Sequence, residues 1–216
     1  MGADERLFES QRDCGLDFEV PRLPTPEPSD DMPTYAARVR DMLGLNGPCI
    51  LGGVSFGGML ACQLATMCQA RAVVLVATCQ NRDAIPGYYH GAEFISRFLP
   101  DGLIRRRCEA SSRLLAKLEK LDRSQYELIR DMSLCVPVLF LRRVARMILR
   151  WNGIRSLACP VYHIHGRLDR VIPIKHVQPA HVVADGGHLI NMTHADEVNQ
   201  FIAQSLDASC ARCKTP

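Results

Sequence analysis

Short apolar runs alternate with stretches of helical periodicity in the first and last thirds of the chain. Cys49–Leu51 and Ala72–Val76 are apolar runs typical of buried parallel strands, and Pro160–His165 and Ala180–Ala184 repeat the pattern nearer the C-terminus. Helical patterns separate these runs. Strands that alternate with helices predict the α/β class, with a mostly parallel sheet flanked by helices.

The flanking helices are predicted from periodicity and from the residues that begin and end them. Thr34 is the expected N-cap of a helix over Tyr35–Leu43, and Gly44 is the expected end of that helix. Leu16–Val20 is predicted to be a further short strand, and Pro21–Pro33, with five prolines, is predicted to be a loop. The other expected helices are a weak one over Glu5–Arg12, one that ends near Cys68 and one over Ala195–Leu206.

Residues 81–157 have a different pattern, in which helical periodicity dominates. The strongest predicted helices in this block are Ser111–Asp131 and Val136–Trp151. Because the block is too long for a single crossover between two strands, we interpret it as an inserted helical cap or lid. The predicted organisation is a core of residues 1–80 and 158–216 with a cap of residues 81–157.

The most informative motif is Gly53-Val54-Ser55-Phe56-Gly57-Gly58, which has the form G-x-S-x-G. The motif lies between a predicted strand and a run of helix-forming residues. A serine in such a turn can expose its hydroxyl as a nucleophile, and the helix N-terminus behind it favours negative charge. The alternative interpretation is a tight turn in which Ser55 only caps the helix.

Two downstream segments supply the partners that a nucleophilic serine needs. Asp169 follows one predicted strand, and the glycine-flanked His188 follows the next. The carboxyl ends of parallel strands meet at one edge of a sheet, so Ser55, Asp169 and His188 are expected together there. Asp185 is a competing acid, but it lies three residues before His188 and would have to fold back to reach it.

The chemistry explains why these three residue types belong together. A serine hydroxyl becomes an effective nucleophile when an imidazole accepts its proton. The imidazole needs a carboxylate on its other nitrogen, which fixes the tautomer and stabilises the cation. Backbone N–H groups then hold the developing oxyanion, and each such donor contributes roughly 3 kcal/mol. The other histidines are His163 and His165, predicted to be structural, and His90, His176, His181 and His194, which belong to no motif.

With the elbow, the His165–Pro173 segment and Gly186-Gly187-His188 in this order, the chain resembles the α/β-hydrolase fold superfamily. The resemblance covers nearly the whole chain. It implies that Ser55 is the nucleophile, Asp169 the acid and His188 the base, with the N–H of Phe56 as one oxyanion donor. It also places Met1 where the family has its second oxyanion donor.

The start of the chain departs from the family pattern. The strand before this oxyanion loop is absent from the sequence, and in the family it lies between the Leu16–Val20 strand and the nucleophile strand. Its loss is expected to leave a buried edge unpaired or to bring those two strands together. Two explanations are a shortened gene model or fragment, and a degraded family member that does not turn over substrate.

Composition narrows the setting. A formal net charge of +3 gives no argument for nucleic-acid binding, and no apolar run reaches the length of a membrane span. Ten scattered cysteines and a charged N-terminus without a signal core predict a cytoplasmic protein with free thiols. The lone Cys210-Ala211-Arg212-Cys213 is interpreted as a frayed tail and not as a zinc site, because no further ligands lie at motif spacing. Serine hydrolase chemistry needs neither a metal nor an organic cofactor, so none is expected.

The predicted cap carries two further features. Arg142, Arg146 and Arg150 recur on one helix face, which indicates either a solvated basic surface or a lid that contacts a membrane or an anionic substrate. Four aromatic residues of the cap are candidates for lining a pocket or for simple packing: Tyr88, Tyr89, Phe94 and Phe98.

Two functions compete at this point. The first is a serine hydrolase that acts on a small carboxylic ester or related acyl compound through an acyl-enzyme. The pattern does not separate esterases from thioesterases, lactonases, amidases or C–C hydrolases. The second is a catalytically impaired hydrolase-like protein that binds a ligand or partner.

Overall fold

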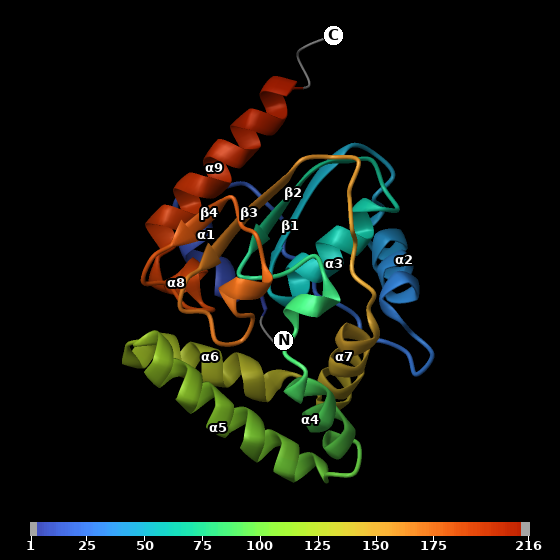
Figure 1. Ribbon diagram of the computed structural model, residues 1–216, viewed down its shortest axis with the longest axis vertical. Coiled ribbons are helices and arrows are strands. Elements are labelled where there is room, and N and C mark those ends of the chain that lie inside the picture. The colour runs from blue at the N-terminus through green and yellow to red at the C-terminus, as the bar shows by residue number, and fades with distance from the viewer. Residues whose placement is uncertain (1–3, 213–216) are drawn as a thin grey trace.

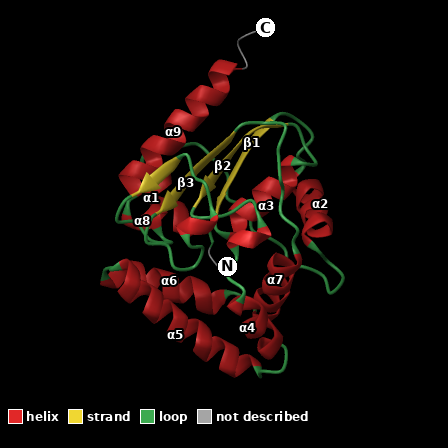
Figure 2. Ribbon diagram, viewed as in Figure 1, coloured by secondary structure: helices red, strands yellow, loops and turns green. Residues whose placement is uncertain are grey.

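The computed structural model describes residues 4–212. Its sheet is entirely parallel, with the strand order β1-β2-β3-β4. The strands are β1 (Cys49–Val54), β2 (Ala70–Val76), β3 (Val161–Gly166) and β4 (His181–Val183). Helices lie on both faces of the sheet (Figures 1 and 2), so the predicted α/β class is confirmed.

The helices form three groups around the sheet (Figure 1). On one face lie α2 (Met32–Leu43) and α3 (Phe56–Ala65); near the other lie α1 (Glu9–Asp13), α8 (Ile190–Thr193) and α9 (Ala195–Arg212). The third group lies below the sheet in this view and contains α4 (Tyr88–Ser96), α5 (Asp101–Glu119), α6 (Arg123–Cys135) and α7 (Val138–Arg150). Short 3-10 turns are η1 (Glu5–Phe8), η2 (Arg82–Ala84) and η3 (Ile174–His176).

The strand register brings the carboxyl ends of the strands to one edge. Val54 of β1 lies beside Val76 of β2, which lies beside Ile164 of β3. The next residue of the first strand, Ser55, continues the ladder, because its N–H donates to the Val76 carbonyl at 3.1 Å. The residues that follow the strands are therefore held along a common edge.

Two hydrophobic clusters fill the space on the two sides of the sheet. Val73 and Leu75 of β2 belong to the first cluster, whereas the next residue, Val76, belongs to the second. This division follows from the two-residue period of a strand. The helices below the sheet take part in both clusters: α7 contributes Val144 and Met147 to the first, and α6 contributes Ile129 and Met132 to the second.

Leu16–Val20 does not form the strand predicted for it. Its side chains alternate between half-buried and exposed, but the segment makes no ladder with the sheet. Among residues 4–212, β1 pairs only with β2 and is an edge strand. The prediction of a strand is therefore wrong: the burial of the side chains alternates, but pairing depends on a neighbouring strand.

Two helix boundaries differ from prediction. The N-cap of α2 is Asp31, whose carboxylate accepts the Thr34 N–H at 2.9 Å, while the Asp31 N–H donates to the Thr34 hydroxyl oxygen at 2.9 Å. Thr34 is thus the third residue of a capping box. The predicted Ser111–Asp131 helix is two helices, because Lys120 adopts a left-handed conformation (φ 54°) that ends α5.

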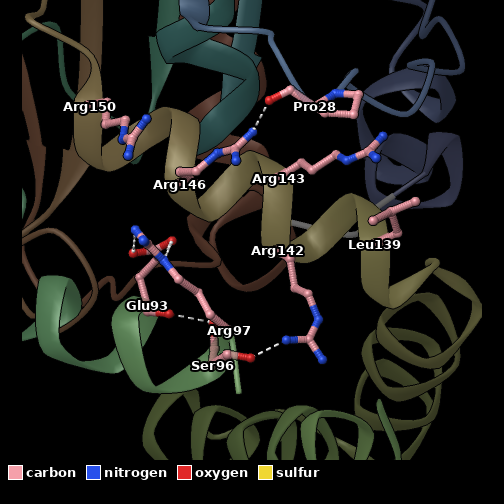
Figure 3. A pocket seen from close by; sticks show the side chains of 9 residues that line it. All are labelled: Pro28, Glu93, Ser96, Arg97, Leu139, Arg142, Arg143, Arg146 and Arg150. Atoms are coloured by element: carbon pink, nitrogen blue, oxygen red, sulfur yellow. Dashed lines mark hydrogen bonds and ion pairs between the residues drawn. The ribbon is translucent and has the colours of Figure 1, made fainter. Parts of the chain in front are cut away.

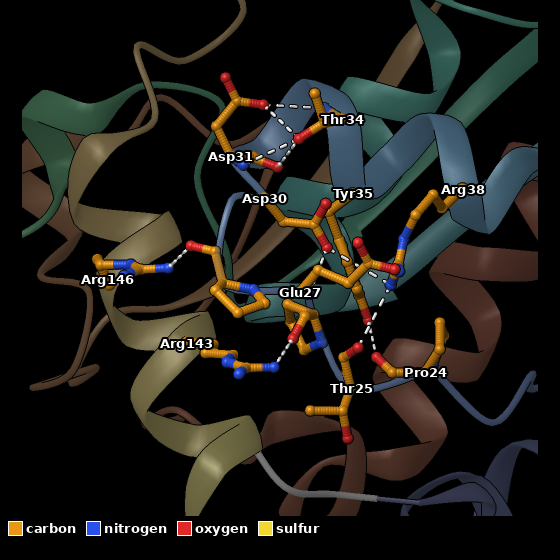
Figure 4. Close-up of polar contacts among 12 residues, drawn as sticks. Pro24, Thr25, Glu27, Asp30, Asp31, Thr34, Tyr35, Arg38, Arg143 and Arg146 are labelled. Atoms are coloured by element: carbon orange, nitrogen blue, oxygen red, sulfur yellow. Dashed lines mark hydrogen bonds and ion pairs between the residues drawn. The ribbon is translucent and has the colours of Figure 1, made fainter.

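The proline-rich segment is a loop, as predicted, up to the start of α2. The Tyr35 hydroxyl donates to the Pro24 carbonyl at 2.8 Å, and Arg143 and Arg146 of α7 donate to the carbonyls of Pro26 and Pro28 (Figure 4). These bonds use main-chain acceptors, which proline retains although it lacks an N–H donor. The loop is thereby fastened to α2 on one side and to α7 on the other.

Candidate active site

Ser55 occupies a strained turn between β1 and α3. Its backbone has φ 53° and ψ −120°, a region that non-glycine residues rarely adopt. The Ser55 side chain makes no capping hydrogen bond to α3, so the helix-cap interpretation is wrong. The turn therefore presents the hydroxyl at the sheet edge instead of folding it back on the helix.

The turn depends on close backbone packing. A Cβ atom at Gly53 would lie 2.3 Å from the Gly57 carbonyl carbon, and one at Gly58 would lie 2.4 Å from Thr78 Cγ2. The Thr78 hydroxyl also donates to the Ser55 carbonyl. A Cβ at Gly57 would meet nothing within 4 Å, so Gly53 and Gly58 are the two glycines that the geometry requires.

His188 lies between the other two predicted residues. Its Nε2 is 3.0 Å from Ser55 Oγ, and its Nδ1 is 2.8 Å from Asp169 Oδ2. The carboxylate can only accept, so His188 carries its proton on Nδ1 and offers a lone pair on Nε2 to the serine hydroxyl. The result is a continuous chain of hydrogen bonds from Ser55 through His188 to Asp169.

Asp169 is held by donors on both carboxylate oxygens. Oδ1 accepts the backbone N–H groups of Val171 at 2.8 Å and Ile172 at 2.9 Å. Oδ2 accepts from His188 and lies 3.3 Å from His165 Nε2. The side chain is fully buried and has lost its contact with water. These donors replace the hydrogen bonds that water would make to a charged carboxylate.

Asp185, the competing acid, is exposed and lies 3.2 Å from His194 Nε2. Its carboxylate does not pair with His188. Of the two acids considered from the sequence, only Asp169 contacts the histidine.

Of the two predicted oxyanion donors, Phe56 lies among the described residues. Phe56 is the first residue of α3, and backbone N–H groups in a first helical turn have no intrahelical acceptor. Its side chain is buried against Tyr35, with ring centroids 6.4 Å apart. Met1 lies outside the described residues, as does Cys213 of the C-x-x-C pair; α9 continues as a helix to Arg212.

The sequence profile of the alpha/beta hydrolase family matches residues 8–201. The chain belongs to this family. No curated protein sequence matches it. No helix among residues 4–212 is long and apolar enough to cross a membrane.

Solved structures of several hydrolases have a similar fold. A thermophilic esterase from Thermogutta terrifontis is 24% identical with a TM-score of 0.70, and the match covers 95% of this chain and 86% of that one. The enol-lactonase from Burkholderia xenovorans LB400 is 15% identical with a TM-score of 0.73, and the match covers 95% of this chain and 88% of that one. A hydrolase from Oleispira antarctica is 10% identical with a TM-score of 0.72, and the match covers 96% of this chain and 88% of that one. At such identities the likeness establishes the fold alone.

In this α/β hydrolase, a pair of buried histidines that contact each other lies next to Asp169. His165 Nε2 is 2.8 Å from the Ile172 carbonyl and donates to it, which leaves Nδ1 to accept from His163 Nε2 at 3.3 Å. Burial lowers the pKa of both imidazoles, that of His163 to about 4. The pair was predicted to be structural, and its contact with Asp169 was not predicted, although His165 lies four residues before that aspartate.

His163 makes stability sensitive to acid. An imidazole in an unfolded chain titrates near 6.5, so as the pH falls from 6.5 towards 4 the unfolded chain binds a proton that the folded protein does not. The free energy of unfolding is expected to fall by ~2 kcal/mol from pH 7 to pH 5 through this group. Urea unfolding at both pH values measures this loss. His163→Gln should remove it, the exposed His176→Gln should retain it, and an unchanged loss in His163→Gln would contradict the assignment.

The four histidines that belong to no motif make no contact with the residues of the triad. His90 and His176 are exposed, His181 Nε2 is 2.6 Å from Glu197 Oε1, and His194 contacts Thr193 and Asp185. None of these contacts involves Ser55, Asp169 or His188.

The arginines of α7 mainly fasten neighbouring segments together. Arg142 donates to the carbonyls of Ser96 and Leu99 and pairs with Asp101 at 2.9 Å, and Arg146 holds the proline-rich loop (Figure 3). They border a surface pocket of about 330 Å³, whose lining includes none of Ser55, Asp169 and His188. Arg150 lines the same pocket and is exposed. Arg142 and Arg146 are therefore engaged in contacts within the protein, and the basic face is not part of the triad site.

The four aromatic residues of α4 and its vicinity separate into two kinds. Tyr89 is half-buried, and burial raises the pKa of its hydroxyl; the negative charge of Asp169 adds to that rise. Phe94 and Phe98 are 57% and 75% exposed and contact each other edge to face, and Tyr88 is also exposed. Of these four residues, only Tyr89 is partly buried.

Proposed function

We propose that this α/β hydrolase is a serine hydrolase that cleaves a carboxylic ester or related acyl substrate through an acyl-enzyme. The observation that carries the proposal is the chain of contacts from Ser55 Oγ to His188 Nε2 and from His188 Nδ1 to Asp169 Oδ2, at 3.0 and 2.8 Å. Membership of the alpha/beta hydrolase family supports hydrolysis as the reaction class. The esterases and the enol-lactonase of similar fold support an acyl substrate.

In the proposed mechanism His188 removes the proton from Ser55 as the oxygen attacks the substrate carbonyl. The tetrahedral oxyanion is held by the Phe56 N–H at the positive end of α3. The protonated His188 then donates to the departing alcohol, which leaves an acyl group on Ser55. Water attacks this acyl group with His188 again as the base, and the acid is released. Asp169 keeps the imidazole in the required tautomer and stabilises its cation.

We further propose that residues 81–157 act as the cap that covers this site. Glu119 of this block supports this role, because its carboxylate accepts the backbone N–H groups of His188 and Leu189. The cap helices would then shape the acyl or alcohol pocket, in which apolar walls exclude water from the acyl-enzyme.

A fluorophosphonate probe tests the proposed nucleophile. It should label the wild-type protein, and Ser55→Ala should abolish the labelling, because an activated serine oxygen forms the covalent bond. Ser111→Ala, which removes an exposed serine of α5, should be labelled like the wild type. Hydrolysis of short-chain p-nitrophenyl esters should follow the same pattern. A wild-type protein that resists the probe would contradict the proposal and favour a ligand-binding role.

A further inference from the structure

A carboxylate from the helical block reaches the loop that carries His188. Glu119, the last residue of α5, accepts the His188 backbone N–H on Oε1 at 2.6 Å and the Leu189 N–H on Oε2 at 3.3 Å. Each oxygen of one carboxylate thus holds one of two successive main-chain donors. Hydrogen bonds to an ionised acceptor are about twice as strong as neutral ones.

The loop is shaped to receive this carboxylate. A Cβ atom at Gly187 would lie 2.2 to 2.4 Å from three atoms, and all three belong to the Glu119 carboxyl group. The φ of Gly187 lies outside the left-handed region, so its backbone conformation is open to other residues. The lack of a side chain at Gly187 therefore leaves room for the Glu119 carboxylate, and a Cβ atom there would displace the flexible end of that side chain.

Glu119 is itself held in place at the end of α5. Lys120 ends the helix in a left-handed conformation, and its N–H donates to the Ala116 carbonyl. The adjacent α6 packs against α5 and places Ile129 and Met132 in the same hydrophobic cluster as Leu189. The carboxylate and the loop that it contacts consequently belong to one packed unit.

We propose that Glu119 is a positioning residue, which fixes the His188 main chain so that the imidazole reaches Ser55. This inference rests on the proposed function of His188 as the base. The position of an imidazole depends on the position of its own Cα atom. A loop free to move at residue 188 would therefore lengthen the contact of 3.0 Å between His188 Nε2 and Ser55 Oγ. The catalytic arrangement is then complete only while the end of α5 is seated against the core.

Substitution of Glu119 separates positioning from substrate binding. Glu119→Ala removes both acceptors and is expected to lower kcat on the order of 10- to 100-fold, because small misplacements of reacting groups are costly. KM should stay near the wild-type value, since Glu119 acts on the loop. Glu119→Gln keeps one acceptor oxygen, so its kcat should lie between those of the wild type and Glu119→Ala. Glu109→Ala is the matched control, because Glu109 lies on the same helix but contacts only Arg113 and Arg130 of the helical block.

Hydrogen exchange gives a readout that does not depend on turnover. The amides of His188 and Leu189 should exchange at least several-fold faster in Glu119→Ala than in the wild type, whereas the amides of the sheet should keep their protection. Glu109→Ala should leave these two amides protected. If the fluorophosphonate probe fails on the wild type while these amides still respond, the proposed function fails but the anchoring by Glu119 stands.

Gly187 allows a double-mutant cycle. Gly187→Ala should lower kcat in the wild-type background by displacing the carboxylate, and it should have no further effect in Glu119→Ala, where the clash is gone. Equal losses in the two backgrounds would overturn the link between the two residues. A Glu119→Ala protein with wild-type kcat and wild-type amide exchange would overturn the proposal itself.

Discussion

Replacing Asp169 by asparagine is expected to lower kcat for ester hydrolysis about 10⁴-fold, the loss seen when a triad carboxylate becomes an amide. The asparagine oxygen would remain with the N–H groups of Val171 and Ile172, which need an acceptor. Its NH₂ group would then face His188 Nδ1. That donor forces the imidazole proton onto Nε2, where the imidazole can no longer accept a proton from Ser55.

Asp185→Asn provides the matched control for this experiment. Asp185 is exposed and contacts His194, so its substitution should leave kcat unchanged. Steady-state kinetics on both variants, with circular dichroism to verify folding, measures the contrast. Activity of Asp169→Asn at the wild-type level, or a large loss in Asp185→Asn, would show that the wrong acid has been assigned.

The second large effect is expected in stability, at the first glycine of the serine turn. Gly53→Ala would bring a methyl group 2.3 Å from the Gly57 carbonyl carbon and 2.6 Å from the Gly57 oxygen and the Gly58 nitrogen. These are backbone atoms at the start of α3 and cannot rotate away. We therefore expect the free energy of unfolding to fall by roughly 3 kcal/mol, the upper range for overpacked sites.

Gly57→Ala is the matched substitution in the same motif. A methyl group there meets no atom within 4 Å, and alanine favours a helix over glycine, so the Tm should be unchanged or slightly higher. Urea unfolding of the two variants tests the difference. Equal stabilities for Gly53→Ala and Gly57→Ala would contradict the packing that we assign to the turn.

Local patterns predicted the parts of the fold that depend on local chemistry. The apolar run that became β2 was found because a parallel strand buried on both faces is apolar along its length, and Ala72 to Val76 are all buried. The end of α2 at Gly44 followed from the left-handed conformation that glycine tolerates. The break at Lys120 had no such signal, because lysine is an ordinary helix former.

In the candidate site, too, residues in motifs could be predicted from the sequence, and a residue outside any motif could not. Ser55, Asp169 and His188 were chosen from motifs, and the structure brings their side chains together, while their catalytic roles remain proposals. Glu119 lay in no motif, since its contact with the His188 loop joins segments 69 residues apart. Contacts of this kind depend on how α5 is placed relative to the His188 loop, which periodicity does not specify.

The helical block is not a lid that can be exchanged freely. Ile129 and Met132 of α6 and Val144 and Met147 of α7 belong to the two clusters that flank the sheet. A block grafted from a relative would have to supply side chains that fill the same spaces on both sides of the sheet. Single substitutions are thus easier to accommodate in α4, whose helix contains no buried residue.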